Sequence, residues 1–146
     1  MTEFYFELSG LFLSAFISST LAPGGSELLL VYLLNDGEIP VILLVITATL
    51  GNSLGAMSTW LLGFLVATKI SSKRIEKSLS GQSIERINRW GAWVLLLSWL
   101  PVLGDGLCLA AGWLRLGLWR CVAAIVIGKA LRYLAVVYLF ASVASQ

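Results

Sequence analysis

Long apolar runs, separated by short polar or Pro/Gly breaks, dominate the hydrophobic pattern of this chain. The longest run covers residues 41–68 and predicts a transmembrane helix, because about 20 apolar residues span the hydrocarbon core. A second long apolar helix is expected over roughly 118–145. These two segments are the predicted membrane-spanning helices.

Two further pairs of apolar arms are too short to span a bilayer. The first pair covers 8–22 and 26–34, and the second covers 91–100 and 107–114. At about 1.5 Å per residue, no arm reaches the roughly 30 Å of a hydrocarbon core. The turn residues that interrupt the pairs are Pro23, Gly24, Gly25, Pro101 and Gly104. Each pair is therefore expected to form either a re-entrant hairpin or one broken helix.

Composition places the chain in the membrane as one domain, residues 1–146. The sequence is 58% hydrophobic and 12% charged, with a mean hydropathy of +0.90. A water-soluble core of this size could not cover so much apolar surface, so lipid must be the main solvent. The formal net charge of +2 offers no extended basic face for nucleic acid.

The polar segment at 69–90 is rich in lysine and arginine and separates the two halves of the chain. The positive-inside rule predicts that this loop is cytoplasmic. We therefore expect an integral protein of the bacterial inner (plasma) membrane.

The two halves repeat the same order of features, which predicts an internal repeat. The matched pairs are Pro23 with Pro101, Glu27 with Asp105 and, one residue short of the same spacing, Gly51 with Gly128. The expected fold is all-α, with inverted repeats at 8–68 and 91–145. Each repeat would be a re-entrant hairpin followed by a full transmembrane helix. In a rival topology each broken element crosses completely, giving four spans with both termini on the side of the central loop.

Four ionisable residues in apolar surroundings are the candidate site. An ionised side chain at the bilayer centre costs roughly 2.5–3.5 kcal/mol, so Glu27, Asp105, Lys129 and Arg132 need partners or water. We expect them to meet in a polar cavity that binds an anion such as a phosphate, helped by helix N-termini at the hairpin tips. Desolvation favours a neutral carboxyl group, so the two acids are also candidates for proton coupling. Ser26 is expected to cap a helix.

A stripe of small residues recurs every four positions in the first long helix. It consists of Gly51, Gly55, Thr59 and Gly63, and Gly128 is its counterpart in the last helix. Small residues allow close backbone approach between helices in lipid. The stripe is expected to pack within the monomer or across a homo-oligomer.

Four segments resemble the DedA (VTT-domain, SNARE-associated) family, in its YqaA-like branch. They are LAPGGSE at 21–27, GNSLG at 51–55, SWLPVLGD at 98–105 and GKALRY at 128–133. The resemblance implies facing re-entrant helices, and lipid-moving roles such as undecaprenyl-phosphate recycling and phospholipid scrambling. It also implies that the functional carboxylate of the acidic Pro-Gly motif is Glu27. The arginines that flank the second hairpin in other members are missing, and Lys129 and Arg132 would supply their charge.

The expected function is a transporter or scramblase for an anionic lipid headgroup, either a polyprenyl phosphate or a phospholipid. A small-ion or proton-coupled exchanger and a non-catalytic membrane scaffold in envelope homeostasis remain alternatives. Histidine is absent, and we find no nucleophile, base and metal cluster for an enzyme. We therefore expect no catalytic residue, metal or cofactor. Membrane lipids are the expected partners.

Overall fold

The structure is a computed structural model that describes residues 2–20, 24–69, 89, 91–100 and 103–144. Every regular element in these ranges is helical, in agreement with the predicted all-α membrane class. The elements are α1 (Thr2–Ser18), α2 (Gly25–Asp36), α3 (Val41–Lys69), the short 3₁₀ helix η1 (Leu95–Trp99), α6 (Leu103–Trp113) and α7 (Leu118–Ala144). A helical turn at 91–94 leads into η1.

Two helices, α3 and α7, are long and apolar enough to cross a membrane, in agreement with the two predicted transmembrane helices. Their candidate spans, Val41–Thr68 and Leu118–Ala144, contain 28 and 27 residues. At about 1.5 Å rise per residue both exceed a roughly 30 Å hydrocarbon core. Only 28% of the apolar window of α7 is buried inside the protein. A core helix of a soluble protein would be mostly buried, so this exposed apolar surface fits a lipid environment.

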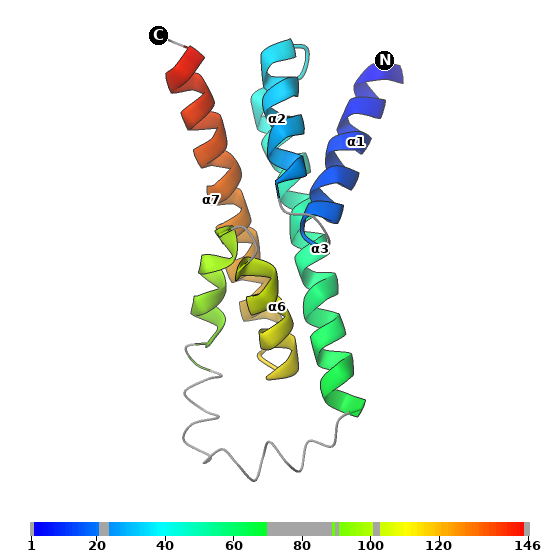
Figure 1. The fold of residues 1–146 in the computed structure, drawn as a ribbon, viewed down its shortest axis with the longest axis vertical. Helices are drawn as coiled ribbons and strands as arrows, with labels where there is room; N and C mark the ends of the chain where they lie inside the picture. Colours follow the sequence, from blue (N-terminus) through cyan, green and yellow to red (C-terminus); the bar gives the residue numbers. More distant parts are fainter. Residues whose placement is uncertain (1, 21–23, 70–88, 90, 101–102, 145–146) are drawn as a thin grey trace.

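The shorter helices form two hairpins that pack on the long ones (Figure 1). α1 runs from the N-terminus towards the middle of the molecule, and α2 returns to the same end. The segment 91–99 enters from the opposite end, and α6 returns to it. Both chain termini lie at the end from which the first hairpin enters, and Lys69 at the end of α3 lies at the other.

Two helices begin earlier than the hydrophobic pattern predicts. α1 starts at Thr2 instead of residue 8, because Phe4 and Leu8 both pack against the core and extend its apolar face. α6 starts at Leu103 instead of residue 107, so that Asp105 lies in its first turn. A carboxylate there interacts favourably with the positive end of the helix dipole.

Glycines bring α3 into close contact with one arm of each hairpin. A Cβ on Gly51 would lie 2.4 Å from the carbonyl oxygen of Phe12 in α1. A Cβ on Gly63 would lie 2.2 Å from the carbonyl oxygen of Leu109 in α6. These distances leave no room for a side chain, so the helices approach at backbone contact. Gly51 and Gly63 thus both face neighbours within the same chain.

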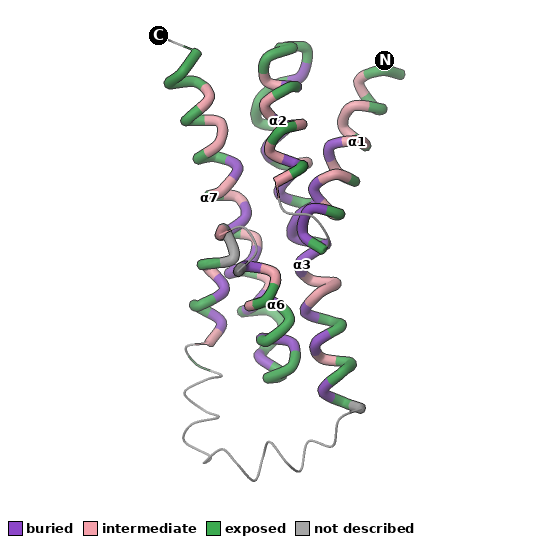
Figure 2. The backbone as a smooth tube through the Cα atoms, viewed as in Figure 1, coloured by how far each residue is buried: buried purple, intermediate pink, exposed green. Residues whose placement is uncertain are grey.

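Each hairpin contacts both long helices. The first arm of each hairpin packs on the long helix of its own half: α1 on α3, and η1 on α7. The second arm contacts the long helix of the other half: α6 packs on α3, and α2 contacts α7 as well as α3 of its own half. Figure 2 shows the buried residues gathered along these contacts in the middle of the molecule, while the outer ends of the helices are more exposed. The two halves therefore interlock.

Two apolar clusters form the interior. One is centred on Leu11, Leu30, Leu44 and Tyr133, where α1, α2, α3 and α7 meet. The other is centred on Trp60, Leu95 and Ile125. It also contains Cys108 and Cys121, which are buried and free.

Candidate functional site

A buried lysine on α7 forms the first ion pair of the candidate site. The side chain of Lys129 is 1% exposed, and its Nζ lies 3.4 Å from Oδ1 of Asp105 in the first turn of α6. Charge-assisted hydrogen bonds are usually about 2.7–2.9 Å long, so this contact is loose. Within the part of the chain that the structure describes, Asp105 is the one hydrogen-bond acceptor of Lys129. The ammonium therefore retains donor capacity for a further oxygen.

The second ion pair lies one helical turn further along α7. The guanidinium of Arg132 contacts the carboxylate of Glu27, near the start of α2. Their side chains are 12% and 19% exposed. Because positions i and i+3 share a helix face, Lys129 and Arg132 bring the carboxylates of both hairpins to one side of α7.

A hydroxyl joins the two hairpins directly. Ser19, which follows α1, donates to Oδ1 of Asp105 over 3.1 Å. Ser18, one residue earlier, accepts a 3.1 Å hydrogen bond from the backbone N–H of Ser26 and so links α1 to α2. The ends of the two hairpins are thus tied together beside the ion pairs.

Tyr133, next to Arg132 on α7, connects three helices through its buried hydroxyl. Asn52 of α3 donates its side-chain N–H to this oxygen over 2.8 Å. Ser26 of α2 shares a 3.0 Å O–H···O bond with it. The prediction that Ser26 caps a helix is wrong, because Gly24 occupies the N-cap of α2 and Ser26 lies inside the helix. Ser26 forms its hydrogen bonds with other helices instead: its hydroxyl bonds to Tyr133, and its backbone N–H donates to Ser18.

Three buried oxygens near this network have no hydrogen-bond partner among the described residues. They are Oδ1 of Asn52, Oγ of Ser53 and Oγ1 of Thr49, all on α3. Buried polar groups are nearly always satisfied in proteins, so each of them has capacity for water, an ion or a ligand group. The seam between α3 and α7 is therefore polar beyond the four charges.

The structure places the other candidate residues around this centre. Gly24 is the N-cap of α2 and has a φ of 104°, a backbone conformation that glycine adopts without strain. Gly25 opens α2, and Gly104 lies buried in the first turn of α6. Gly128 is buried beside Lys129. Pro23 and Pro101 lie outside the described residues.

The remaining stripe residues lie on α3. Gly55 approaches α1, where a Cβ would be 2.6 Å from the carbonyl oxygen of Phe16. Thr59 is half-buried and donates its hydroxyl to the carbonyl oxygen of Gly55, within its own helix.

Sequence reasoning did not single out Ser18, Ser19, Asn52 or Tyr133 as site residues. The available signal was their polarity within apolar stretches, where an amide or hydroxyl needs a partner. Many membrane helices satisfy such groups through their own backbone, as Thr59 does. Polarity alone therefore could not distinguish the network from local bonds.

The assembled cluster contains two carboxylates and two cations, so its formal charge is balanced when all four groups are ionised. The described residues include no group of three His, Cys, Asp or Glu side chains that could hold a metal ion. An anion that binds beside these cations therefore competes with the carboxylates of Glu27 and Asp105.

Comparisons with known proteins agree on one family. The sequence matches the model of the VTT domain over residues 26–142. It is 45% identical to "Inner membrane protein YqaA" of Escherichia coli (strain K12), over 88% of this chain and 87% of that protein. A protein of the same name in Shigella flexneri matches equally well. A Haemophilus influenzae protein is 40% identical, over 88% of this chain and 84% of its own length.

No solved structure matches the chain significantly. The family assignment therefore depends on the domain match and on the sequence relatives, which cover most of both chains. The matched range contains the motifs at 51–55, 98–105 and 128–133 completely, and it contains the last two residues of the motif at 21–27. The chain belongs to the VTT-domain (DedA) family of membrane proteins and is YqaA-like.

Proposed function

We propose that this protein moves an anionic lipid headgroup, that of a polyprenyl phosphate or a phospholipid, between the leaflets of the bacterial inner membrane. The observation that carries the proposal is the pairing of Glu27 and Asp105 with Arg132 and Lys129 of α7. Ionisable residues at membrane depth usually belong to substrate or proton pathways. The name of the E. coli relative, inner membrane protein YqaA, supports the inner-membrane location.

The topology that we propose is two re-entrant hairpins entering from opposite leaflets. The contacts of α6 with α3 and of α2 with α7 support it, because a two-fold axis in the membrane plane would relate one contact to the other. α1, α2 and α6 contain 17, 12 and 11 residues and, at about 1.5 Å each, fall short of a 30 Å core. The positive-inside rule then makes the segment 69–90 cytoplasmic.

Proton binding would open the site to an anion. A proton on Glu27 removes the charge that holds Arg132, and its guanidinium can then accept a phosphate in two parallel hydrogen bonds. Lys129 lies one turn away and can add a second contact. Release of the proton restores the Glu27–Arg132 pair and expels the phosphate. In this scheme one proton binds to Glu27 for each headgroup that binds, and it is released when the headgroup leaves.

Liposomes containing the purified full-length protein test the proposal by transbilayer movement of a polyprenyl phosphate and of phospholipids. Glu27→Gln should bind phosphate lipid but lose pH-dependent movement, because the amide cannot exchange a proton. Arg132→Gln should lose both binding and movement. Glu3→Gln is the matched control, because Glu3 is an exposed acid at the start of α1 and should leave movement unchanged. Unchanged movement in both site variants would refute the proposal and favour a structural role for the charges.

A small-ion or proton-coupled exchanger is the second candidate, favoured by the unpartnered oxygens of Thr49, Asn52 and Ser53. Amide and hydroxyl oxygens can coordinate a small cation. Ion flux without movement of any lipid in the same liposomes would support this function. Absence of both fluxes would favour the non-catalytic scaffold.

A further inference from the structure

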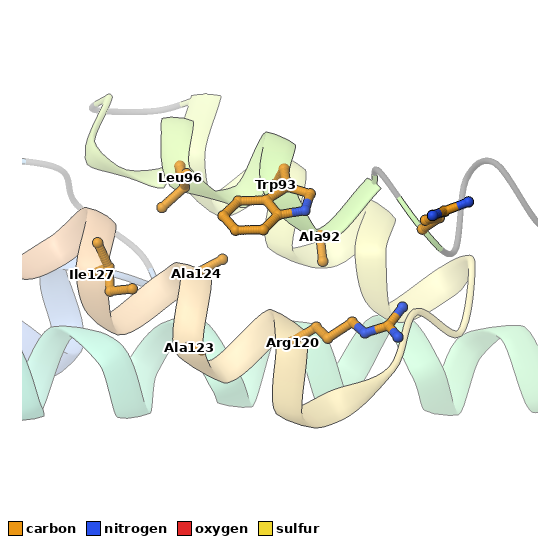
Figure 3. Close-up of a pocket in the computed structure, with 8 residues that line it drawn as sticks. Ala92, Trp93, Leu96, Arg120, Ala123, Ala124 and Ile127 are labelled. Carbon is orange, nitrogen blue, oxygen red and sulfur yellow. The ribbon is translucent and has the colours of Figure 1, made fainter.

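A cavity lies away from the charge cluster, between the segment that precedes the second hairpin's turn and the first half of α7. It has a volume of about 400 Å³, within the range of small-molecule sites. Figure 3 shows Trp93 and Leu96 facing Ala124 and Ile127 across it, with Arg120 at one end. The lining residues are Arg89, Ala92, Trp93, Leu96, Arg120, Ala123, Ala124 and Ile127.

The residues that line the two walls of the cavity have the same spacing along the sequence. On each wall an arginine is followed by apolar residues three, four and seven positions later, which is one face of a helix. The two segments run side by side in the same direction, away from the Lys69 end of the molecule (Figure 1). Because each arginine comes first in its stripe, Arg89 and Arg120 both lie at the end of the cavity nearer that surface.

The chemistry of the cavity selects an amphiphile with an anionic head. The eight lining residues include two guanidiniums and no carboxylate, and the other six are apolar. Guanidiniums bind phosphate oxygens in two parallel hydrogen bonds. Trp93 and Trp119, at the same end of the molecule, are 61% and 83% exposed. Tryptophan concentrates at the headgroup level of a bilayer, so the mouth of the cavity lies where phosphates are.

We propose that this cavity binds an anionic phospholipid, with its phosphate between Arg89 and Arg120 and an acyl chain along Trp93, Leu96 and Ile127. The site shares no lining residue with the Glu27–Asp105 cluster. It depends on the membrane assignment and not on transport, so it goes beyond the proposed function. The lipid would sit in the leaflet at the Lys69 end.

Photolabelling tests the site directly. The full-length protein is placed in nanodiscs of phosphatidylcholine with a trace of phosphatidylglycerol that carries a photoreactive group in one acyl chain. Cross-links, mapped by peptide mass spectrometry, should concentrate at 92–96 and 123–127. A phosphatidylcholine probe with the same reactive chain should label these peptides several-fold less. Equal labelling by the two probes would overturn the proposal, because the arginines would then confer no selectivity.

Substitutions identify the groups responsible. A basic residue near a membrane surface contributes roughly 1 kcal/mol to anionic lipid binding, or about fivefold in affinity. Arg89→Gln and Arg120→Gln should each weaken labelling about fivefold, and the double variant about 25-fold. Ala123→Phe should block labelling by filling the cavity. Arg115→Gln is the matched control, because Arg115 lies over the ring of Phe64 and does not line the cavity.

Two further measurements separate this site from folding and from the transport proposal. Arg89→Lys with Arg120→Lys should keep most of the labelling, because the charge is retained, and circular dichroism should show unchanged helix content in every variant. Inorganic phosphate at millimolar concentration should not displace the lipid, and displacement would mean a free-phosphate site instead. Glu27→Gln should leave labelling intact whether or not it alters lipid movement, whereas loss of labelling in a folded Glu27→Gln protein would contradict a separate site.

Discussion

At the scale of single residues, the interior of this protein depends on a few polar side chains that satisfy one another. Tyr133 is fully buried and serves both Asn52 and Ser26 through one hydroxyl oxygen. Its single proton can be donated to Ser26 while its lone pair accepts from Asn52, so that α2, α3 and α7 are joined at one point. Such bonds contribute about 0.6 kcal/mol on average between membrane helices. Their main effect is therefore orientation of the helices and not bulk stability.

The Lys129–Asp105 pair leads to a prediction about stability. Asp105→Asn should destabilise the protein by about 3 kcal/mol, because the buried ammonium of Lys129 would keep no anionic partner among the described residues. The double variant Asp105→Asn with Lys129→Met should recover most of this loss, since no buried charge remains. The measurement is a double-mutant cycle by reversible unfolding in mixed micelles. Equal destabilisation by the single and double variants would show that the charge pair itself does not matter.

At the scale of helices, α3 is the element on which both hairpins are assembled. Its small residues let α1 approach along one half and α6 along the other. Trp60 lies between these contacts, and its ring stacks on Phe64 with 5.5 Å between centroids. Lipid offers no hydrophobic drive for helix association, so close packing at glycine is what holds these pairs together.

Two glycines of α6 provide a matched test of that packing. A Cβ on Gly112 would lie 1.9 Å from the carbonyl oxygen of Trp60, whereas a Cβ on Gly106 meets nothing within 4 Å. Gly112→Ala should therefore destabilise the protein by about 1–3 kcal/mol through overpacking. Gly106→Ala should be neutral or stabilising by up to about 1 kcal/mol, because alanine favours the helix. Micelle unfolding of both variants measures the difference, and equal stabilities would refute the close α3–α6 contact.

At the scale of the whole molecule, the positions of the two termini and of the basic residues predict the orientation of the protein in the membrane. Both termini lie at one end and the Lys69 end of α3 lies at the other. Arg115, after the end of α6, and Arg120, in the first turn of α7, belong to that second end. The positive-inside rule predicts that this more basic end of the molecule faces the cytoplasm.

Reporter fusions to the two termini test the proposed orientation. Alkaline phosphatase, which is active only outside the cytoplasm, should be active at either terminus, and green fluorescent protein should be dark when exported there. A cysteine introduced at Ser78 should react with a thiol reagent only after the inner membrane is made permeable, with Cys108 and Cys121 replaced by serine beforehand. Cytoplasmic termini would instead match the four-span topology and contradict re-entrant hairpins.

Much of this protein could be predicted from local sequence patterns. Apolar run lengths indicated the two spanning helices and the short arms, because helix rise and bilayer thickness fix what can cross. The cost of burying charge singled out Glu27, Asp105, Lys129 and Arg132 before any contact was known. Helix starts were less predictable, since α1 gains its first residues from packing of Phe4 and Leu8.

Only the tertiary structure decided how those residues combine. The sequence repeat pairs Asn52 of α3 with Lys129 of α7, yet α7 alone supplies both cations and α3 supplies an amide to Tyr133. Ser19 reaches Asp105 from the other half of the chain. Such contacts join residues far apart in sequence, and their geometry follows from helix packing at glycine and not from any local pattern. Composition and periodicity therefore determined that this is a helical membrane protein with buried charges, whereas packing determined which charges meet.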